Sequence, residues 1–417
     1  MRTLTTLRKV SAIVVVLAVG LIRLDAQREA MMLRATPEAV GMSSERLQMA
    51  TAVLRQFVAD HKIAGAVAAV ARRGKVVYLE PVGLQDRDAR TPMTERSLFR
   101  IYSMTKAVTS VAVMMLVEEN RIRLTDPASK FLPEFKNMIV QEITAASPPR
   151  KPAREITIQD LLLHTSGLNH RTSELYQRLK VRSRSIALPQ FIVNITSAPL
   201  MEDPGTRFRY SEATTVLGRI VEVVSGQPFD AFVIARILKP LGMNDTTFWA
   251  DANARARLTT VYQRRDDGTL TAFENEDVPF TQKPALIEGA VGLLSTAEDF
   301  LKFSQMLLNN GESGGTRLLK TETVASMTVN ALPDPILRLK GGNVGWGLAN
   351  VDVVVGPGSR GYLTAIGEYG WDGSIGTFFA IDPSKQLVVT LMTQNVPANP
   401  DGLRQKFKTA VVQSIIE

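Results

Sequence analysis

Residues 98–119 read LFRIYSMTKAVTSVAVMMLVEE. The apolar run at 98–102 is typical of a short β-strand, and the segment 104–119 is long and apolar enough to form a buried helix. Between them, Ser103 and Lys106 form an S-x-x-K pattern that occurs once in the chain. Residues three positions apart share one face of a helix, so the Ser103 hydroxyl and the Lys106 ammonium are expected to meet.

Ser103 and Lys106 are the residue types expected of a nucleophile and the base that activates it. A serine hydroxyl reacts poorly until a neighbouring base removes its proton. A lysine can act as that base when burial lowers its pKa from about 10.4 toward about 7–8. Backbone N–H groups at the start of a helix would also face a developing oxyanion. We therefore expect a serine hydrolase that forms an acyl-enzyme on Ser103.

A second nucleophile motif, G-x-S-x-G, occurs at residues 311–315 with Ser313 at its centre. In α/β-hydrolases this motif works on a sharp strand-to-helix turn, and a histidine follows it in the chain. Here a helical run precedes the motif, and the three histidines, His61, His164 and His170, all lie before it. We interpret residues 311–315 as a polar surface loop.

The composition excludes several kinds of site. The chain has 417 residues, of which 45% are hydrophobic and 22% charged, as in a globular protein with a large core. It has no cysteine, so disulfides, thiolate zinc sites and a cysteine nucleophile are excluded. With few histidines and no H-E-x-x-H, we expect no metal and no cofactor. The net charge of +8 is spread along the chain and does not indicate nucleic-acid binding.

The N-terminus resembles a secretory leader. Arg2, Arg8 and Lys9 precede an apolar run at 10–22, which is shorter than the about 20 residues that a spanning helix needs. We expect residues 1–26 to be a signal peptide, with an uncleaved N-terminal anchor as the alternative. Either would place the protein in the periplasm or outside the cell.

The remaining patterns predict an α+β fold with one antiparallel sheet. Hairpins are predicted near both ends of the chain, at 64–82 and 377–394, and amphipathic helices at 43–61 and 401–416. The middle of the chain alternates helical stretches with long loops. We therefore expect one hydrolase domain at 34–417, with a sheet lobe (34–102 and 285–417), a mainly helical lobe (103–284) and a cleft between them.

Two further clusters carry reactive or turn-forming groups. Tyr210 and Glu212 follow a turn and precede a helical stretch, and a tyrosine near a lysine can shuttle protons. Residues 370–374 read GWDGS and precede the second hairpin, where Gly373 would let a strand edge approach the substrate and offer a backbone N–H. Taken alone, each cluster is also consistent with a structural role. Tyr210 could be a packed aromatic residue, and residues 370–374 could form a turn that leads into a strand.

Together with further motifs, these residues resemble a known family. IQDLLLHTSGL stands at 158–168, GAVGLLST at 289–296 and Asp-Pro at 382–383. In this order they resemble the serine β-lactamase and penicillin-binding-protein superfamily, on its class C-like branch with the family VIII carboxylesterases. The resemblance covers nearly the whole chain from residue 35 and implies a β-lactamase/transpeptidase-like fold.

The resemblance also implies roles for individual residues. Ser103 would attack an acyl carbonyl while Lys106 and Tyr210 act as the general-base pair. The backbone N–H groups of Ser103 and Ser374 would form the oxyanion hole. His164 would be a packed residue of a structural motif and not a base.

The chain departs from the family at two positions. The tyrosine motif usually carries Asn two residues after Tyr, but here Glu212 stands there and could pair with Lys106, point elsewhere or select a cationic substrate. Where lactamases and peptidases carry Lys-Thr-Gly, this chain has Trp371-Asp372-Gly373, and related esterases usually have Trp-Gly-Gly. Losing the lysine weakens recognition of an acidic group, and an indole suits apolar groups.

These departures favour a carboxylesterase that acts on small esters. A β-lactamase or D-stereospecific peptidase that uses the same nucleophile is the alternative hypothesis. A non-catalytic binding relative is the third, and Glu212 is the main feature in its favour.

Overall fold

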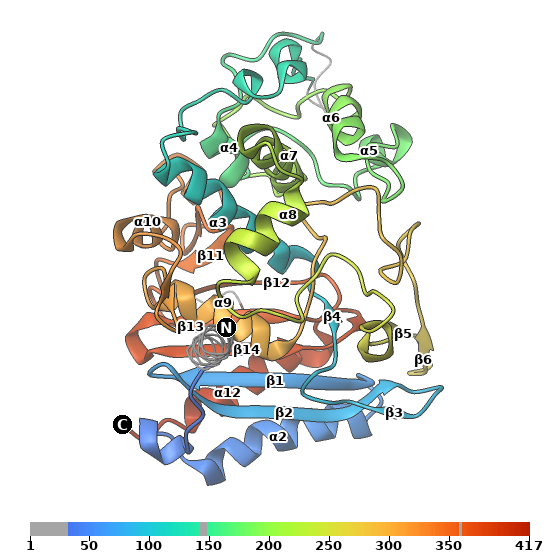
Figure 1. The fold of residues 1–417 in the computed structure, drawn as a ribbon, viewed down its shortest axis with the longest axis vertical. Coiled ribbons are helices and arrows are strands. Elements are labelled where there is room, and N and C mark those ends of the chain that lie inside the picture. Colours follow the sequence, from blue (N-terminus) through green and yellow to red (C-terminus); the bar gives the residue numbers. More distant parts are fainter. Residues whose placement is uncertain (1–31, 142–147, 358–360) are drawn as a thin grey trace, which may run out of the picture.

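The computed structural model describes residues 32–141, 148–357 and 361–417. The leader predicted at residues 1–26 lies outside this part. An eight-stranded antiparallel sheet crosses the lower half of the molecule (Figure 1). Its strands, in spatial order, are β10 (Val344–Gly347), β11 (Val351–Val354), β12 (Tyr369–Asp372), β13 (Phe378–Asp382), β14 (Leu387–Met392), β1 (Gly65–Arg72), β2 (Lys75–Asp86) and β3 (Thr91–Pro92).

The sheet joins the two ends of the chain, as the sequence predicts. Strand β1 pairs with β2 through the tight turn at Arg73-Gly74, and β13 pairs with β14. Strand β14 then pairs with β1 in a register that sets Thr390 opposite Ala69. Because every one of these pairs is antiparallel, the predicted α+β class with an antiparallel sheet built from both ends of the chain is confirmed for the main sheet.

Helices cover both faces of the sheet. Helices α2 (Ser44–Ala59) and α12 (Leu403–Gln413) pack together on one face, and α9 (Ala297–Leu308) lies against the other (Figure 1). Alternate residues of β1 face opposite sides of a strand, so Ala68 and Val70 join the core beneath α2, while Val67 and Ala69 join the core beneath α9.

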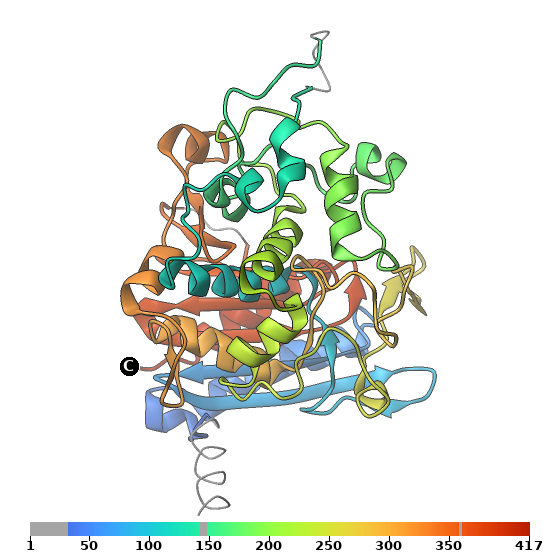
Figure 2. The ribbon, with the colours of Figure 1, turned by 45° about the horizontal axis from the view of Figure 1, so that its top comes forward.

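Most of the chain from α3 to α8 lies in the mainly helical upper half of the molecule (Figures 1 and 2). At its centre α3 (Thr105–Glu118) packs against α7 (Ala213–Ser225) and α8 (Phe229–Val233), and it is buried from Thr105 to Leu116. The remaining helices here are α4 (Ile158–Leu162), α5 (Glu174–Arg178) and α6 (Leu188–Thr196). Two later helices, α10 (Thr321–Met327) and α11 (Asp334–Leu339), precede β10. No helix of the described residues is long and apolar enough to cross a membrane.

Two local predictions differ from the structure, and one small sheet was not predicted. The strand expected at 98–102 is confined to β4 (Phe99–Arg100), which pairs with β7 (Leu294–Ser295), and a 3-10 turn follows at Tyr102–Met104. The loop expected at 311–315 is a hairpin, β8 (Glu312–Ser313) with β9 (Thr316–Arg317). A small sheet of β5 (Tyr262–Arg264), β6 (Leu270–Ala272) and β15 (Asn395–Val396) had no strong pattern in the sequence.

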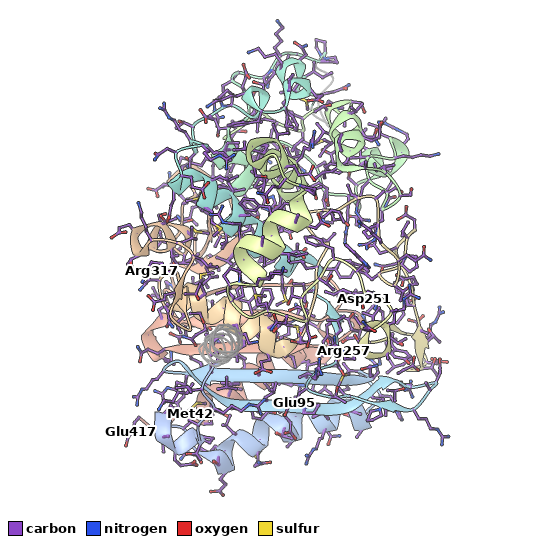
Figure 3. The ribbon with its side chains drawn as sticks, viewed as in Figure 1. Met42, Glu95, Asp251, Arg257, Arg317 and Glu417 are labelled. Atoms are coloured by element: carbon purple, nitrogen blue, oxygen red, sulfur yellow. The ribbon has the colours of Figure 1, made fainter. Side chains whose placement is uncertain are left out.

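The described N-terminal segment and the C-terminus meet at one corner, where Met42 and Glu417 are labelled in Figure 3. Met42 forms a β-bridge with Ile415, and the Ser43 N–H donates to the Ser414 carbonyl at 2.8 Å. The Ser43 side chain also caps α2 by accepting the Arg46 N–H. These contacts hold α2 beside α12 under the sheet.

Candidate active site

Ser103 and Lys106 meet as the sequence predicts. Ser103 lies in the 3-10 turn that leads into α3, and the Lys106 Nζ lies 3.3 Å from the Ser103 Oγ. Lys106 is 1% exposed and also donates to the Ala290 carbonyl at 3.0 Å. The lysine is therefore held by neutral oxygens, and it forms no ion pair with any residue that the structure describes. This arrangement fits a general base beside a nucleophile.

The residue before the nucleophile has an unusual backbone. Tyr102 has a φ of 41°, a conformation that costs a non-glycine residue on the order of 1 kcal/mol or more. Its buried ring packs edge-on against Phe280, and its hydroxyl donates to Asn275 Oδ1 at 2.7 Å. These contacts stabilise the bend after β4. The bend places Ser103, the next residue, at the wall of a cleft. The same contacts also explain why the predicted strand stops early.

Residues 289–296, the GAVGLLST segment, pack against α3 and hydrogen-bond to it. Thr109 donates to the Gly289 carbonyl at 2.7 Å, and the Thr105 hydroxyl accepts the Leu293 N–H at 3.1 Å. A Cβ on Gly289 would lie 2.6 Å from the Thr214 carbonyl, so only glycine permits this approach of α7. The close packing positions the Ala290 carbonyl to accept from Lys106. The sequence analysis did not identify this carbonyl, because 184 residues separate it from the lysine.

Tyr210 lies beside the lysine within an aromatic cluster. The Lys106 Nζ is 4.8 Å from the centre of the Tyr210 ring, and the Trp371 indole N–H donates to the Tyr210 oxygen at 3.1 Å. Trp371 packs edge-on against Trp346 at 4.6 Å between ring centres. The structure thus brings the four predicted residues Ser103, Lys106, Tyr210 and Trp371 to one place. The indole orients the tyrosine in addition to lining the cleft.

His164 packs behind Tyr210, with 4.7 Å between the ring centres. It is fully buried, and its Nδ1 accepts the Ser211 backbone N–H at 3.2 Å. Burial, and then the nearby Lys106 charge, holds the pKa of His164 well below its usual value, so the imidazole is neutral at pH 7. It makes no hydrogen bond to Ser103 in the described structure, which agrees with a packing role.

Glu212 is buried at the N-terminus of α7. Its carboxylate accepts from the Thr215 hydroxyl at 3.5 Å. Among the residues that the structure describes, Glu212 and Lys106 form no ion pair. Its negative charge acts instead on His170, where it opposes the burial that lowers the pKa of that imidazole. The pairing that would hold Lys106 protonated is therefore not seen.

Asp372 has a partner from the last helix. Arg404 on α12 pairs with Asp372 at 2.9 Å and donates to the carbonyls of Gly373 and Thr377 at 3.0 and 3.2 Å. One turn later on α12, buried Lys408 pairs with buried Glu368, just before β12. Helix α12 therefore holds both ends of β12, the strand that carries Trp371, and Asp372 is part of that anchor.

Gly373 allows β12 to approach the nucleophile turn. A Cβ there would lie 2.7 Å from the Ile101 carbonyl and would collide with the Thr377 hydroxyl. In the described structure the backbone N–H groups of Ser103 and Ser374 donate no hydrogen bond, and both residues line the cleft. The family resemblance assigns these two N–H groups to an oxyanion hole, the role for which donors beside a nucleophilic serine are suited.

Replacing Gly373 with alanine is expected to lower kcat by about 10²-fold or more, because it would shift the neighbouring Ser374 N–H, one of the two donors that the resemblance assigns to the oxyanion hole. KM should change less, since the ground-state carbonyl binds the donors more weakly. Steady-state kinetics measures both constants, and thermal unfolding of the variant shows whether the fold is kept.

Gly74→Ala is the control for this glycine replacement, because a Cβ at that turn meets nothing within 4 Å. Its φ of 75° makes the alanine variant less stable without any contact to the cleft, so kcat should stay unchanged. An unchanged kcat in Gly373→Ala would contradict the assignment of the oxyanion donors.

Five of the eight predicted site residues line one cleft of about 760 Å³, whereas Lys106, Glu212 and Gly373 do not line it. Ser103, Tyr210, Trp371, Asp372 and Ser374 all contribute to it. The chain between α4 and β7 adds residues that spacing alone did not reveal: His170, Arg171, Thr172, Tyr176, Gln177, Lys180, Arg182, Ser183, Phe273, Asn275 and Glu276. Within the described ranges no group of three or more His, Asp or Glu side chains is placed to hold a metal ion.

Comparison with known proteins agrees with this geometry. The Beta-lactamase family model matches residues 50–413. Esterase EstB of Burkholderia gladioli is 30% identical over 84% of this chain and 91% of its own length. Protein Rv1367c of Mycobacterium tuberculosis is 35% identical over 83% of this chain and 89% of its own.

A solved structure is similar throughout the fold. EstCE1, described as a hydrolase with promiscuous acyltransferase activity, superposes with a TM-score of 0.77 at 25% identity, over 88% of this chain and 98% of that one. The resemblance inferred from the S-x-x-K and its companion motifs is thus confirmed. The chain belongs to the beta-lactamase family of serine hydrolases.

Proposed function

We propose that this protein is a carboxylesterase that hydrolyses small esters through an acyl-enzyme on Ser103. The observation that carries the proposal is Trp371, whose indole stands in the cleft beside the nucleophile and donates to Tyr210. An indole offers an apolar face to an acyl or alcohol group and no charge to a β-lactam carboxylate. The similarity to Esterase EstB supports an ester substrate, and EstCE1 is described as a hydrolase with acyltransferase activity.

The geometry supports acylation in the following way. The Ser103 oxygen attacks the ester carbonyl carbon while its proton passes to the Lys106 Nζ, 3.3 Å away. The negative charge that develops on the carbonyl oxygen faces the N–H groups of Ser103 and Ser374. The carbon–oxygen bond to the alcohol then breaks, and the alcohol leaves with a proton from the Lys106–Tyr210 pair.

Deacylation repeats these steps with water as the nucleophile. Water beside Tyr210 attacks the acyl carbonyl and gives its proton to the same pair. The bond to the Ser103 oxygen breaks, and that oxygen takes the proton back. The products are one carboxylic acid and one alcohol, and the enzyme returns to its starting state.

The proposal is tested by mass spectrometry of the intact protein mixed with p-nitrophenyl butyrate. We expect a burst of p-nitrophenol and one butyryl adduct, which peptide mapping assigns to Ser103. Nitrocefin is the parallel substrate, and its kcat/KM should be lower by about 10²-fold or more, because the cleft binds no carboxylate through residue 371. Comparable efficiencies would favour a β-lactamase, and no adduct from either substrate would favour a non-catalytic relative.

A further inference from the structure

Both carboxylates that line the cleft already have protein partners. Glu276 pairs with Arg182 at 2.8 Å, and Asp372 pairs with Arg404 at 2.9 Å. Arg182 also binds both oxygens of the fully buried Glu288. The acidic groups of the cleft are therefore neutralised, and they leave no negative charge to bind a cationic substrate.

Arg171 lines the same cleft with different surroundings. It is half-buried, its guanidinium lies 5.4 Å from the ring of Tyr102, and Tyr102 immediately precedes the nucleophile. Its Nη1 is buried without a hydrogen-bond partner, and within the described part of the chain Arg171 forms no ion pair. The nearby buried carboxylate of Glu288 forms an ion pair with Arg182 and not with Arg171.

A buried guanidinium nitrogen without an acceptor is costly, because its N–H groups have left water and formed no hydrogen bond in exchange. Lys180, exposed at the same cleft, also forms no ion pair with the described residues. Arg171 and Lys180 are therefore cations of the cleft without an ion pair among the described residues, whereas both carboxylates that line the cleft are paired. A substrate carboxylate would give Arg171 the acceptor that the protein does not provide.

We propose that the site prefers esters that carry a second, ionised carboxylate, and that Arg171 binds this group. The inference rests on the proposed ester hydrolysis at Ser103 and names its substrate class. Trp371 stands on β12 at the position where lactamases and peptidases carry a lysine. Arg171, in the loop between α4 and α5, provides a cation in its place. Recognition of an acid is thereby moved to the helical side of the cleft.

The test compares two p-nitrophenyl esters with the same six-carbon acyl chain: the mono-ester of adipic acid, which is anionic, and the hexanoate, which is neutral. The measured quantity is the ratio of their kcat/KM values, because any general loss of activity cancels in it. The ratio should fall about tenfold or more in Arg171→Gln, chiefly through the KM of the adipate ester. Arg171→Lys should give an intermediate ratio, because it keeps the charge but not the planar fork.

Arg178→Gln is the matched control, because Arg178 is an exposed cation on α5 that does not line the cleft. In Arg178→Gln the ratio of kcat/KM for the adipate ester to kcat/KM for the hexanoate should equal that of the unmodified protein. A ratio that stays constant in Arg171→Gln, or that falls equally in Arg178→Gln, would overturn the role of Arg171.

A binding measurement separates this inference from the proposed function. Calorimetry on the full-length Ser103→Ala protein should show adipate binding about tenfold or more tighter than in the Ser103→Ala, Arg171→Gln double variant. If the unmodified protein hydrolyses neither ester, ester hydrolysis fails as the function, while adipate binding still decides the role of Arg171. Equal adipate binding in the two proteins would refute the inference even if both esters are hydrolysed.

Discussion

Replacing Ser103 with alanine is expected to lower kcat for p-nitrophenyl butyrate by about 10⁴-fold or more, because the acyl-enzyme can no longer form. The oxyanion donors and the cleft remain, so a small residual rate above that of water is expected. The measurement is single-turnover release of p-nitrophenol together with the intact mass of the protein, which should show no acyl adduct.

Ser313→Ala is the matched control for this prediction. Ser313 stands at the centre of the other nucleophile motif, but the structure places it in the short hairpin of β8 and β9 and outside the cleft. The kcat of Ser313→Ala should equal that of the unmodified protein. Loss of turnover in Ser313→Ala with activity retained in Ser103→Ala would refute the site assignment.

Replacing Lys106 with methionine is expected to reduce the acylation rate by about 10²–10⁴-fold, the range that a general base contributes. Methionine occupies a similar volume, so the packing of α3 should be kept, but the Ala290 carbonyl loses its donor. We therefore expect a loss of about 1–3 kcal/mol in the free energy of unfolding as well. Stopped-flow acylation and denaturant titration measure the two effects separately.

The pH dependence of Lys106→Met distinguishes loss of the base from loss of packing. Hydroxide can remove the Ser103 proton in place of the lysine, so the residual rate should rise about tenfold per pH unit above neutrality. A variant that is merely misfolded would show no such rise. Acylation within about tenfold of the unmodified protein would mean that another group, with Tyr210 first among the candidates, is the base.

The local elements were predictable because their signals lie within a few residues. The hairpin of β1 and β2 follows from two apolar runs and the Arg73-Gly74 turn. Buried helix α3 follows from its apolar length, and its start differs from the prediction by one residue. The 3.3 Å contact between Ser103 and Lys106 follows from their spacing at the head of that helix.

The errors and open questions arose where distant segments act on a residue. Tyr102 looked like part of a strand, but Asn275 and Phe280 hold it at a positive φ. Asp372 looked like an unexplained departure from the family pattern, and Arg404 of the last helix is its partner. Neither contact has a signal in local sequence, because the partners meet only when segments far apart in the chain are packed together.

The sequence by itself determined the family and the pairing of Ser103 with Lys106, because periodicity and short motifs act over one or two helical turns. The tertiary structure decided the surroundings of that pair. It set the Ala290 carbonyl against Lys106, kept Glu212 out of an ion pair with that lysine, and left Arg171 without an ion pair among the described residues. These outcomes depend on packing between segments far apart in the chain, where the effect of each charge is set by its burial and its partners.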